Sequence, residues 1–176
     1  MSSGQEDNFN PSLIYRLFFL YIEPISALAG AFYAAVLPQT YLDLLSSNAH
    51  VATHTSSIAA IDTPTLASLY QLANLYLLFA LNEHFVLSHS TSLRTWRALL
   101  FGLLIADFGH LATMIPVALV KEGGYDGLVK TFINFWTWNA MEWGSVGFVY
   151  VGAGMRISFL VRTSGWWSAK GKEKAE

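Results

Sequence analysis

Residues 96–120 read WRALLFGLLIADFGHLATMIPVALV, and this stretch decides the class of fold. Beyond Arg97 it holds a single acid, Asp107, and a single histidine, His110. An α-helix needs about 20 mainly apolar residues to cross a bilayer, and this run is long enough. A helix of a soluble bundle would carry charged residues along its outer face, which this run lacks. The stretch therefore predicts a transmembrane helix.

The rest of the chain repeats this character. Hydrophobic residues make up 53 % of it and charged residues only 12 %, whereas soluble domains carry about 25 % charged residues. Its mean hydropathy is +0.40. We predict an all-α fold, a four-helix transmembrane bundle over residues 13–163, with a polar N-terminal tail, 1–12, and a basic tail, 164–176. The four spans are expected at about 13–37, 66–87, 96–120 and 131–161.

Positive charge is unevenly divided between the two sides of this bundle. One side holds Lys121 and Lys130, and the side with both termini holds the rest of the basic residues: Arg16, Arg94, Arg97, Arg156, Arg162, Lys170, Lys172 and Lys174. Cytoplasmic loops carry the excess of Lys and Arg, so we expect both termini in the cytosol. The last residues, KEKAE, resemble a di-lysine retrieval signal, and we expect the endoplasmic reticulum membrane.

Other classes of function are excluded by charge and composition. The net charge is −2, so the chain lacks the basic surface of a nucleic-acid-binding protein. Cysteine is absent, which excludes disulfides and thiol catalysis. The expected partners are membrane lipid and a hydrophobic small-molecule substrate, and a homo-oligomer stays open.

Each predicted span carries one carboxylic acid, which is an unfavourable residue in a bilayer. These acids are Glu23, Glu83, Asp107 and Glu142. An acid at the centre of a spanning helix costs about 2.5–3.5 kcal/mol on insertion scales, so we expect all of them to face the protein interior. At 1.5 Å per residue, Glu23, Asp107 and Glu142 should meet about 15 Å deep, with Glu83 one to two turns away.

Polar and aromatic residues accompany these acids. His110 follows Asp107 by three residues and so shares its helix face, and Asn139 precedes Glu142 in the same way. Asn82 is next to Glu83. Three tryptophans surround Glu142, namely Trp136, Trp138 and Trp143. Pro24, next to Glu23, has no N–H for the carbonyl of Leu20 and predicts a kink.

Three interpretations stay open for this set. The polar groups could cross-link the helices, although such hydrogen bonds average about 0.6 kcal/mol. Carboxyl groups kept protonated by the low dielectric could act as general acids on a lipid-soluble substrate. The groups could also line a pocket that binds without chemistry. No metal is expected, because the Glu-x-x-His spacing of carboxylate-bridged bundles is missing, and acid catalysis needs no cofactor.

Several strings carry a resemblance to known proteins. They are YRLFFLYIEPISALAGAFYAA, NLYLLFALNEHFVL, WRALLFGLLIADFGHL and WNAMEWG. Over roughly residues 10–165 the chain resembles an uncharacterised fungal family of small four-span membrane proteins. In architecture alone it is similar to the emopamil-binding and sterol-isomerase group and to fungal membrane-bound terpene cyclases. The resemblance implies the topology, and it carries over no catalytic position.

The hypothesis that follows is acid-initiated isomerisation or cyclisation of an isoprenoid-like molecule. Glu142 or Asp107 would donate the proton, Glu23 and Glu83 would act as partner or base, and His110 would orient Asp107 or relay the proton. Trp136, Trp138 and Trp143 would stabilise developing positive charge through their ring faces. Asn139 and Asn82 would contact the substrate. The alternative is a lipid- or sterol-binding or structural membrane protein without catalysis.

Overall fold

The computed structural model describes residues 9–46, 61–121 and 124–164. Every regular element in these residues is helical, and none is a strand. Four helical stretches are long and apolar enough to cross a membrane: Leu13–Val36, Thr63–His89, Leu93–Val120 and Ala140–Thr163. The predicted all-α transmembrane bundle is confirmed, and the chain is a multi-pass membrane protein.

The first span is a helix with a wider, π-helical turn in its N-terminal half. It consists of α1 (Leu13–Leu17), the π-helical segment η1 (Phe18–Ile22) and α2 (Glu23–Val36). The π-helical turn lies directly before Glu23 and Pro24, where proline cannot donate a backbone hydrogen bond. A short helix, α3 (Pro38–Ser46), follows after Leu37 leaves the helical conformation.

The second and third spans are long, continuous helices. The second, α4 (Thr63–His89), starts at a side-chain cap, because the Asp62 side chain accepts a hydrogen bond from the Thr65 N–H and Pro64 occupies the first turn. The third, α5 (Leu93–Lys121), continues through Pro116.

The fourth span starts later than the sequence analysis predicted. The expected start at residue 131 falls in a separate short helix, α6 (Tyr125–Phe132), which is followed by the 3₁₀ turn η2 (Phe135–Thr137). The span itself consists of α7 (Ala140–Glu142), the π-helical η3 (Trp143–Gly147) and α8 (Phe148–Thr163). Asn139 and Glu142 form a reciprocal capping box, which fixes a helix start at this point.

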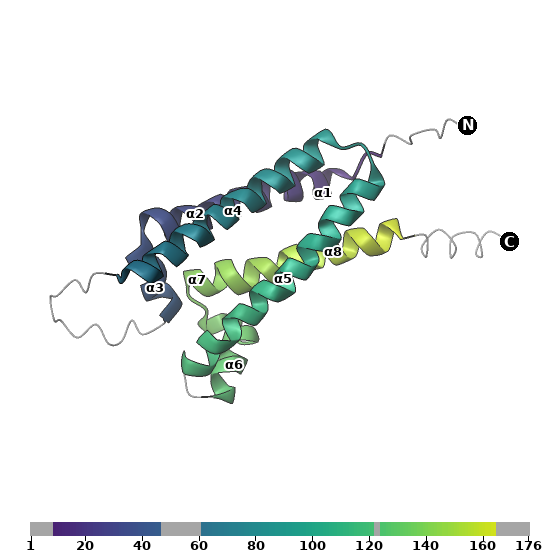
Figure 1. Ribbon diagram of the computed structural model, residues 1–176. Coiled ribbons are helices and arrows are strands. Elements are labelled where there is room, and N and C mark those ends of the chain that lie inside the picture. Colours follow the sequence, from purple (N-terminus) through teal and green to yellow (C-terminus); the bar gives the residue numbers. More distant parts are fainter. Residues whose placement is uncertain (1–8, 47–60, 122–123, 165–176) are drawn as a thin grey trace, which may run out of the picture.

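The spans pack as two pairs that diverge from one end. α2 lies along α4, and α5 lies along α8, whereas α4 and α5 contact each other little. Figure 1 shows α4 and α5 as an open V, joined at the short connection between them and separated at the end near α3 and α6. The described start of the first span and the end of α8 lie at the joined end (Figure 1).

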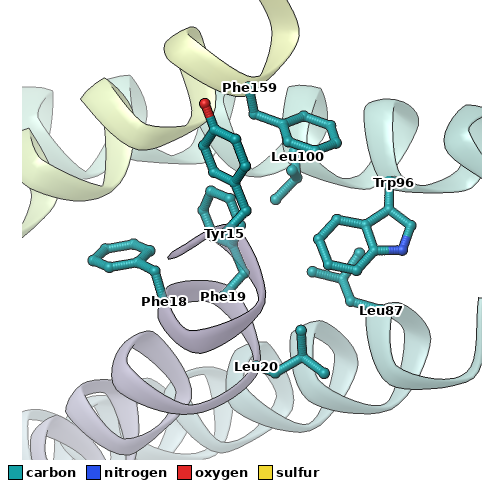
Figure 2. Close-up of a cluster of buried hydrophobic side chains, with 8 residues drawn as sticks. All are labelled: Tyr15, Phe18, Phe19, Leu20, Leu87, Trp96, Leu100 and Phe159. Carbon is teal, nitrogen blue, oxygen red and sulfur yellow. The ribbon is translucent and has the colours of Figure 1, made fainter. Parts of the chain in front are cut away.

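A cluster of buried aromatic and aliphatic side chains closes the joined end. Figure 2 shows its members, which come from all four spans: Tyr15, Phe18, Phe19, Leu20, Leu87, Trp96, Leu100 and Phe159. The Tyr15 hydroxyl and Ser158 Oγ lie 2.8 Å apart, and Trp96 Nε1 donates to the Ser90 carbonyl over 3.0 Å. Close packing and such bonds, rather than the hydrophobic effect, hold helices together in lipid. The cluster therefore fixes one end of the bundle.

Two predicted segments fall largely outside the described residues. These are the polar tail, 1–12, of which only 9–12 are described, and the basic tail, 164–176, of which only Ser164 is described. The cytosolic location of the termini stays a prediction.

Candidate functional site

The centre of the bundle holds a buried arginine surrounded by carboxylates. Arg156 of α8 is completely buried. Its Nη1 donates to Asp107 Oδ2 over 2.6 Å, and its Nη2 donates to Glu23 Oε1 over 2.6 Å. Nη2 also lies 3.5 Å from Glu83 Oε1. One acid from each of the other spans therefore meets the arginine of the fourth.

Small and aromatic neighbours shape the space for this cluster. Gly152 lies one helical turn before Arg156, and a Cβ there would lie 3.0 Å from Arg156 Nη1 and 3.1 Å from Glu23 Oε1. Glycine is therefore the residue that lets the ion pair lie against the α8 backbone. The rings of Phe19 and Phe79 lie 5.8 and 5.9 Å from the guanidinium carbon, within the range of cation–π attraction.

The charges of the cluster do not balance. One guanidinium faces three carboxyl groups, and all four side chains are buried. Glu23 Oε2, Glu83 Oε2 and Arg156 Nε have no hydrogen-bond partner among the described residues. Burying unpaired charge is costly, so the surplus carboxyl groups must be balanced by protons or by a positively charged guest.

A histidine compensates for the proline beside Glu23. His84 Nδ1 lies 2.8 Å from the Leu20 carbonyl oxygen, the group for which Pro24 has no N–H. Because a carbonyl only accepts, Nδ1 carries the proton in this bond. His84 thus ties α4 to the first span one turn away from the acid cluster.

A cavity of about 470 Å³ extends from the cluster toward α3. Glu23 and Asp107 form part of its wall, together with His110, Tyr76 and Phe79. The remaining lining is mostly small or apolar and comes from several elements: Ser26, Ala27, Gly30, Tyr33, Tyr41, Leu44, Leu72, Leu75, Ala106, Ala140, Met141, Gly144, Ser145, Phe148 and Val149. The cavity is thus an apolar chamber with acidic groups at one end.

Two further polar side chains of the wall have distinct environments. His110 lies one turn after Asp107, and its Nε2 is buried without a hydrogen-bond partner among the described residues. Tyr41 lies on α3, outside the spans. Burial raises the pKa of Tyr41, and a hydrogen bond with Tyr76 opposes this only in part. The Tyr41 phenol therefore stays neutral.

The acids that meet in the structure are not the ones that the depth estimate brought together. Glu23, Glu83 and Asp107 meet at one place, whereas Glu142 lies outside both the cluster and the cavity lining. The estimate paired Glu142 with Glu23 and Asp107 and set Glu83 apart, which was wrong for both residues. It assumed a span from residue 131, and the later helix start moves Glu142 from the middle of the span to its first turn.

Glu142 and Asn139 are occupied in starting the fourth span. Glu142 Oε2 accepts from the Asn139 N–H, and Asn139 Oδ1 accepts from the Glu142 N–H, both over 2.9 Å. Asn139 Nδ2 also donates to the Leu44 carbonyl over 3.1 Å, which ties the helix start to α3. The Asn-x-x-Glu spacing is the sequence signal for this cap.

The predicted aromatic and amide contacts lie elsewhere than the cavity. Trp136 is 83 % exposed and Trp143 is 52 % exposed. Trp138 packs on Trp143 with ring centroids 5.1 Å apart and donates from Nε1 to the Lys130 carbonyl. Asn82 is exposed. None of these four side chains lines the cavity.

Arg156 is the residue that the sequence analysis missed. It was counted among the cytosolic charges that orient the bundle, which was wrong, because it is buried between all four spans. The available signal was its position in VGAGMRISFLV, an apolar run that ends before the next basic residue, Arg162. An intramembrane arginine normally pairs with intramembrane acids.

The site contains no recognisable metal centre in the part of the chain that the structure describes. No group of three or more His, Cys, Asp or Glu side chains there has an arrangement suited to a metal ion.

Comparison with known proteins assigns the chain to a family whose function is unknown. No curated protein and no solved structure matches the chain. One family model matches residues 11–166, and it is described as a domain of unknown function, DUF7704. The match covers all four spans and every residue of the arginine cluster. The chain therefore belongs to the DUF7704 family.

Proposed function

We propose that the protein binds a hydrophobic, isoprenoid-like molecule in the central cavity and catalyses its isomerisation or cyclisation by proton transfer. The observation that carries the proposal is the composition of the cavity wall. Two carboxyl groups, Glu23 and Asp107, and the imidazole of His110 share one chamber whose lining is otherwise mainly apolar.

The size and lining of the chamber suit a small hydrophobic guest. Its volume of about 470 Å³ lies within the roughly 300–1,000 Å³ of small-molecule sites, which are mostly apolar with a few polar groups that orient the ligand. Here the two carboxyl groups and the imidazole belong to the part of the wall around Asp107, so a guest would place its reactive end there. Its apolar part would lie against Leu72, Leu75 and Met141.

The charge of the cluster suits a reaction that passes through a cation. Protonation of a carbon–carbon double bond gives a carbocation and leaves the donor as a carboxylate, so negative charge develops in a cluster of three carboxyl groups and one guanidinium close to the new cation. The aromatic side chains of Phe79 and Tyr76 belong to the same wall, and aromatic rings can stabilise positive charge. Aromatic residues of α4 thus take the role that the sequence analysis gave to the tryptophans.

The reaction gains one proton and loses one, so its protons balance. The Asp107 carboxyl group donates a proton to one carbon of the double bond, and the C–H bond forms from its π electrons. Loss of a proton from a neighbouring carbon to His110 or Glu23 regenerates a double bond at a new position, and return of that proton to Asp107 restores the site. Attack by a second double bond before that loss closes a ring. Either product has the mass of the substrate.

The placement of Glu142 and Arg156 refines this assignment. Glu142 starts a helix and lies outside the cavity lining, so we assign the donor role to Asp107, with His110 as the group that accepts or relays the proton. Arg156 is a positioning residue: it holds one oxygen of Asp107 and one of Glu23 at 2.6 Å. Its two hydrogen bonds fix both carboxyl groups at the same end of the chamber.

Binding without catalysis is the second candidate, and the same ion pairs favour it. Carboxyl groups already engaged by a guanidinium serve well as a fixed, negatively charged end of a binding pocket. This candidate predicts a bound hydrophobic ligand and no new product.

The test uses the purified protein in lipid nanodiscs with farnesol, geranylgeraniol or squalene as probe. We expect an isobaric product with a shifted retention time by chromatography and mass spectrometry. Asp107→Asn and His110→Gln should each abolish turnover, and Asp126→Asn, an exposed acid on α6, should leave it unchanged. Thermal unfolding of each variant separates lost chemistry from lost fold. Unchanged turnover in folded Asp107→Asn and His110→Gln would refute proton transfer by these groups, and binding without product supports the second candidate.

A further inference from the structure

The cavity beside Arg156 adjoins a second one. This second cavity has a volume of about 570 Å³. Residues at the junction belong to the lining of both: Tyr41, Leu72, Tyr76, His110 and Ser145. The two cavities are therefore adjacent, with these five side chains at their common boundary.

The second cavity lies in the open part of the V between α4 and α5. Its own lining, apart from Leu45 of α3, comes from the facing sides of these helices: Pro64, Thr65, Ser68 and Leu69 on α4, and Thr113, Met114 and Val117 on α5. Figure 1 shows the two helices separating toward this end. Ser68 and Thr113 are exposed, so the second cavity reaches the molecular surface between the two helices.

We infer that the substrate is a long apolar chain that enters from the bilayer between α4 and α5 and keeps its tail in the second cavity. Its reactive end lies among Asp107, Glu23 and His110, and the chain beyond that end passes Tyr76 and Leu72 on its way to the second cavity. The inference rests on the proposed function for the chemistry of the reactive end. It adds the length of the substrate and the direction from which it arrives.

The lining of the second cavity fits a tail rather than a second polar group. Leu69, Met114 and Val117 present apolar surface to it. The hydroxyls of Ser68 and Thr113 donate to carbonyls of their own helices, Pro64 and His110, over 2.9 and 2.7 Å. These hydroxyls are thereby satisfied locally, and the cavity offers a guest mainly carbon contacts.

A competition experiment tests this inference. A photoreactive farnesol analogue is bound to the protein in nanodiscs and displaced by farnesol, a short prenyl alcohol, or by solanesol, a long one. Ser68→Trp and Thr113→Trp place an indole in the second cavity from an exposed position on each helix. The matched controls are Ala67→Trp and Ala112→Trp, exposed neighbours that do not line either cavity.

We expect the cavity variants to weaken the binding of solanesol by about tenfold or more, because several methylene groups of its tail can no longer be buried in the second cavity. Farnesol should displace the probe from the cavity variants as effectively as it does from the unaltered protein. In both control variants, the two alcohols should displace the probe as they do in the unaltered protein. Equal effects on both alcohols, or none on solanesol, would overturn the inference while leaving the proposed function in place. If neither alcohol displaces the probe from the unaltered protein, the proposed function fails, and the inference fails with it.

Discussion

Replacement of Arg156 by methionine removes the positive charge that pairs with three buried carboxyl groups. Arg156 is completely buried, and the side chains of Glu23, Glu83 and Asp107 are 7 %, 0 % and 9 % exposed. Removing one partner of a buried ion pair costs about 3–5 kcal/mol, because the other charge stays behind without compensation. For a chain of this size that corresponds to a fall of about 6–20 °C in melting temperature.

The assay is thermal unfolding of the purified protein in detergent, followed by loss of the monodisperse peak in size-exclusion chromatography. Arg162→Met, at an exposed position in the last turn of α8, is the matched control and should melt like the unaltered protein. Adding Glu23→Gln, Glu83→Gln and Asp107→Asn to Arg156→Met should recover most of the loss, since no unpaired charge then remains. An unchanged melting temperature for Arg156→Met alone would refute the argument.

Three further substitutions test local parts of the account by the same assay. Gly152→Ala should destabilise the protein by about 1–3 kcal/mol, because the new Cβ would crowd the guanidinium of Arg156. Gly154→Ala is the control, since a Cβ there meets nothing within 4 Å, and it should not destabilise the protein. Equal effects of the two substitutions would contradict the crowding at Gly152. Asn139→Ala should cost about 1 kcal/mol through loss of the helix cap, and no change would remove the cap from the account. His84→Phe should cost about 1–3 kcal/mol by leaving the Leu20 carbonyl without that donor; a melting point equal to that of the unaltered protein would show that the bond contributes nothing.

Much of the fold could be predicted from the sequence, because bilayer length and hydropathy act locally. The runs that cross the membrane, the Asp62 cap and the proline beside Glu23 are all written in short stretches of residues. The start of the fourth span was misplaced because hydropathy alone continues through residues 131–139. The Asn139–Glu142 pair, whose cap spacing was available, decides the boundary instead.

The candidate site could be predicted only in part. One acid per span pointed to a buried polar centre, and three of the acids do meet. Which three could not be decided, because the depth estimate depended on the helix boundary. The role of Arg156 depends on distances across four helices, and a single basic residue near a helix end resembles an orientation signal until the packing is known. The position of the second cavity depends on the divergence of α4 and α5, for which no local pattern exists.

The central claim is that a hydrophobic molecule occupies the chamber between Asp107 and Tyr41. Photolabelling with a diazirine analogue of farnesol, followed by peptide mapping, measures this directly. The account predicts adducts on wall residues such as Ala27, Ala106 and Gly144, and their loss when excess farnesol competes. Adducts confined to lipid-facing side chains such as Ile25 and Phe101, unaffected by competitor, would contradict it.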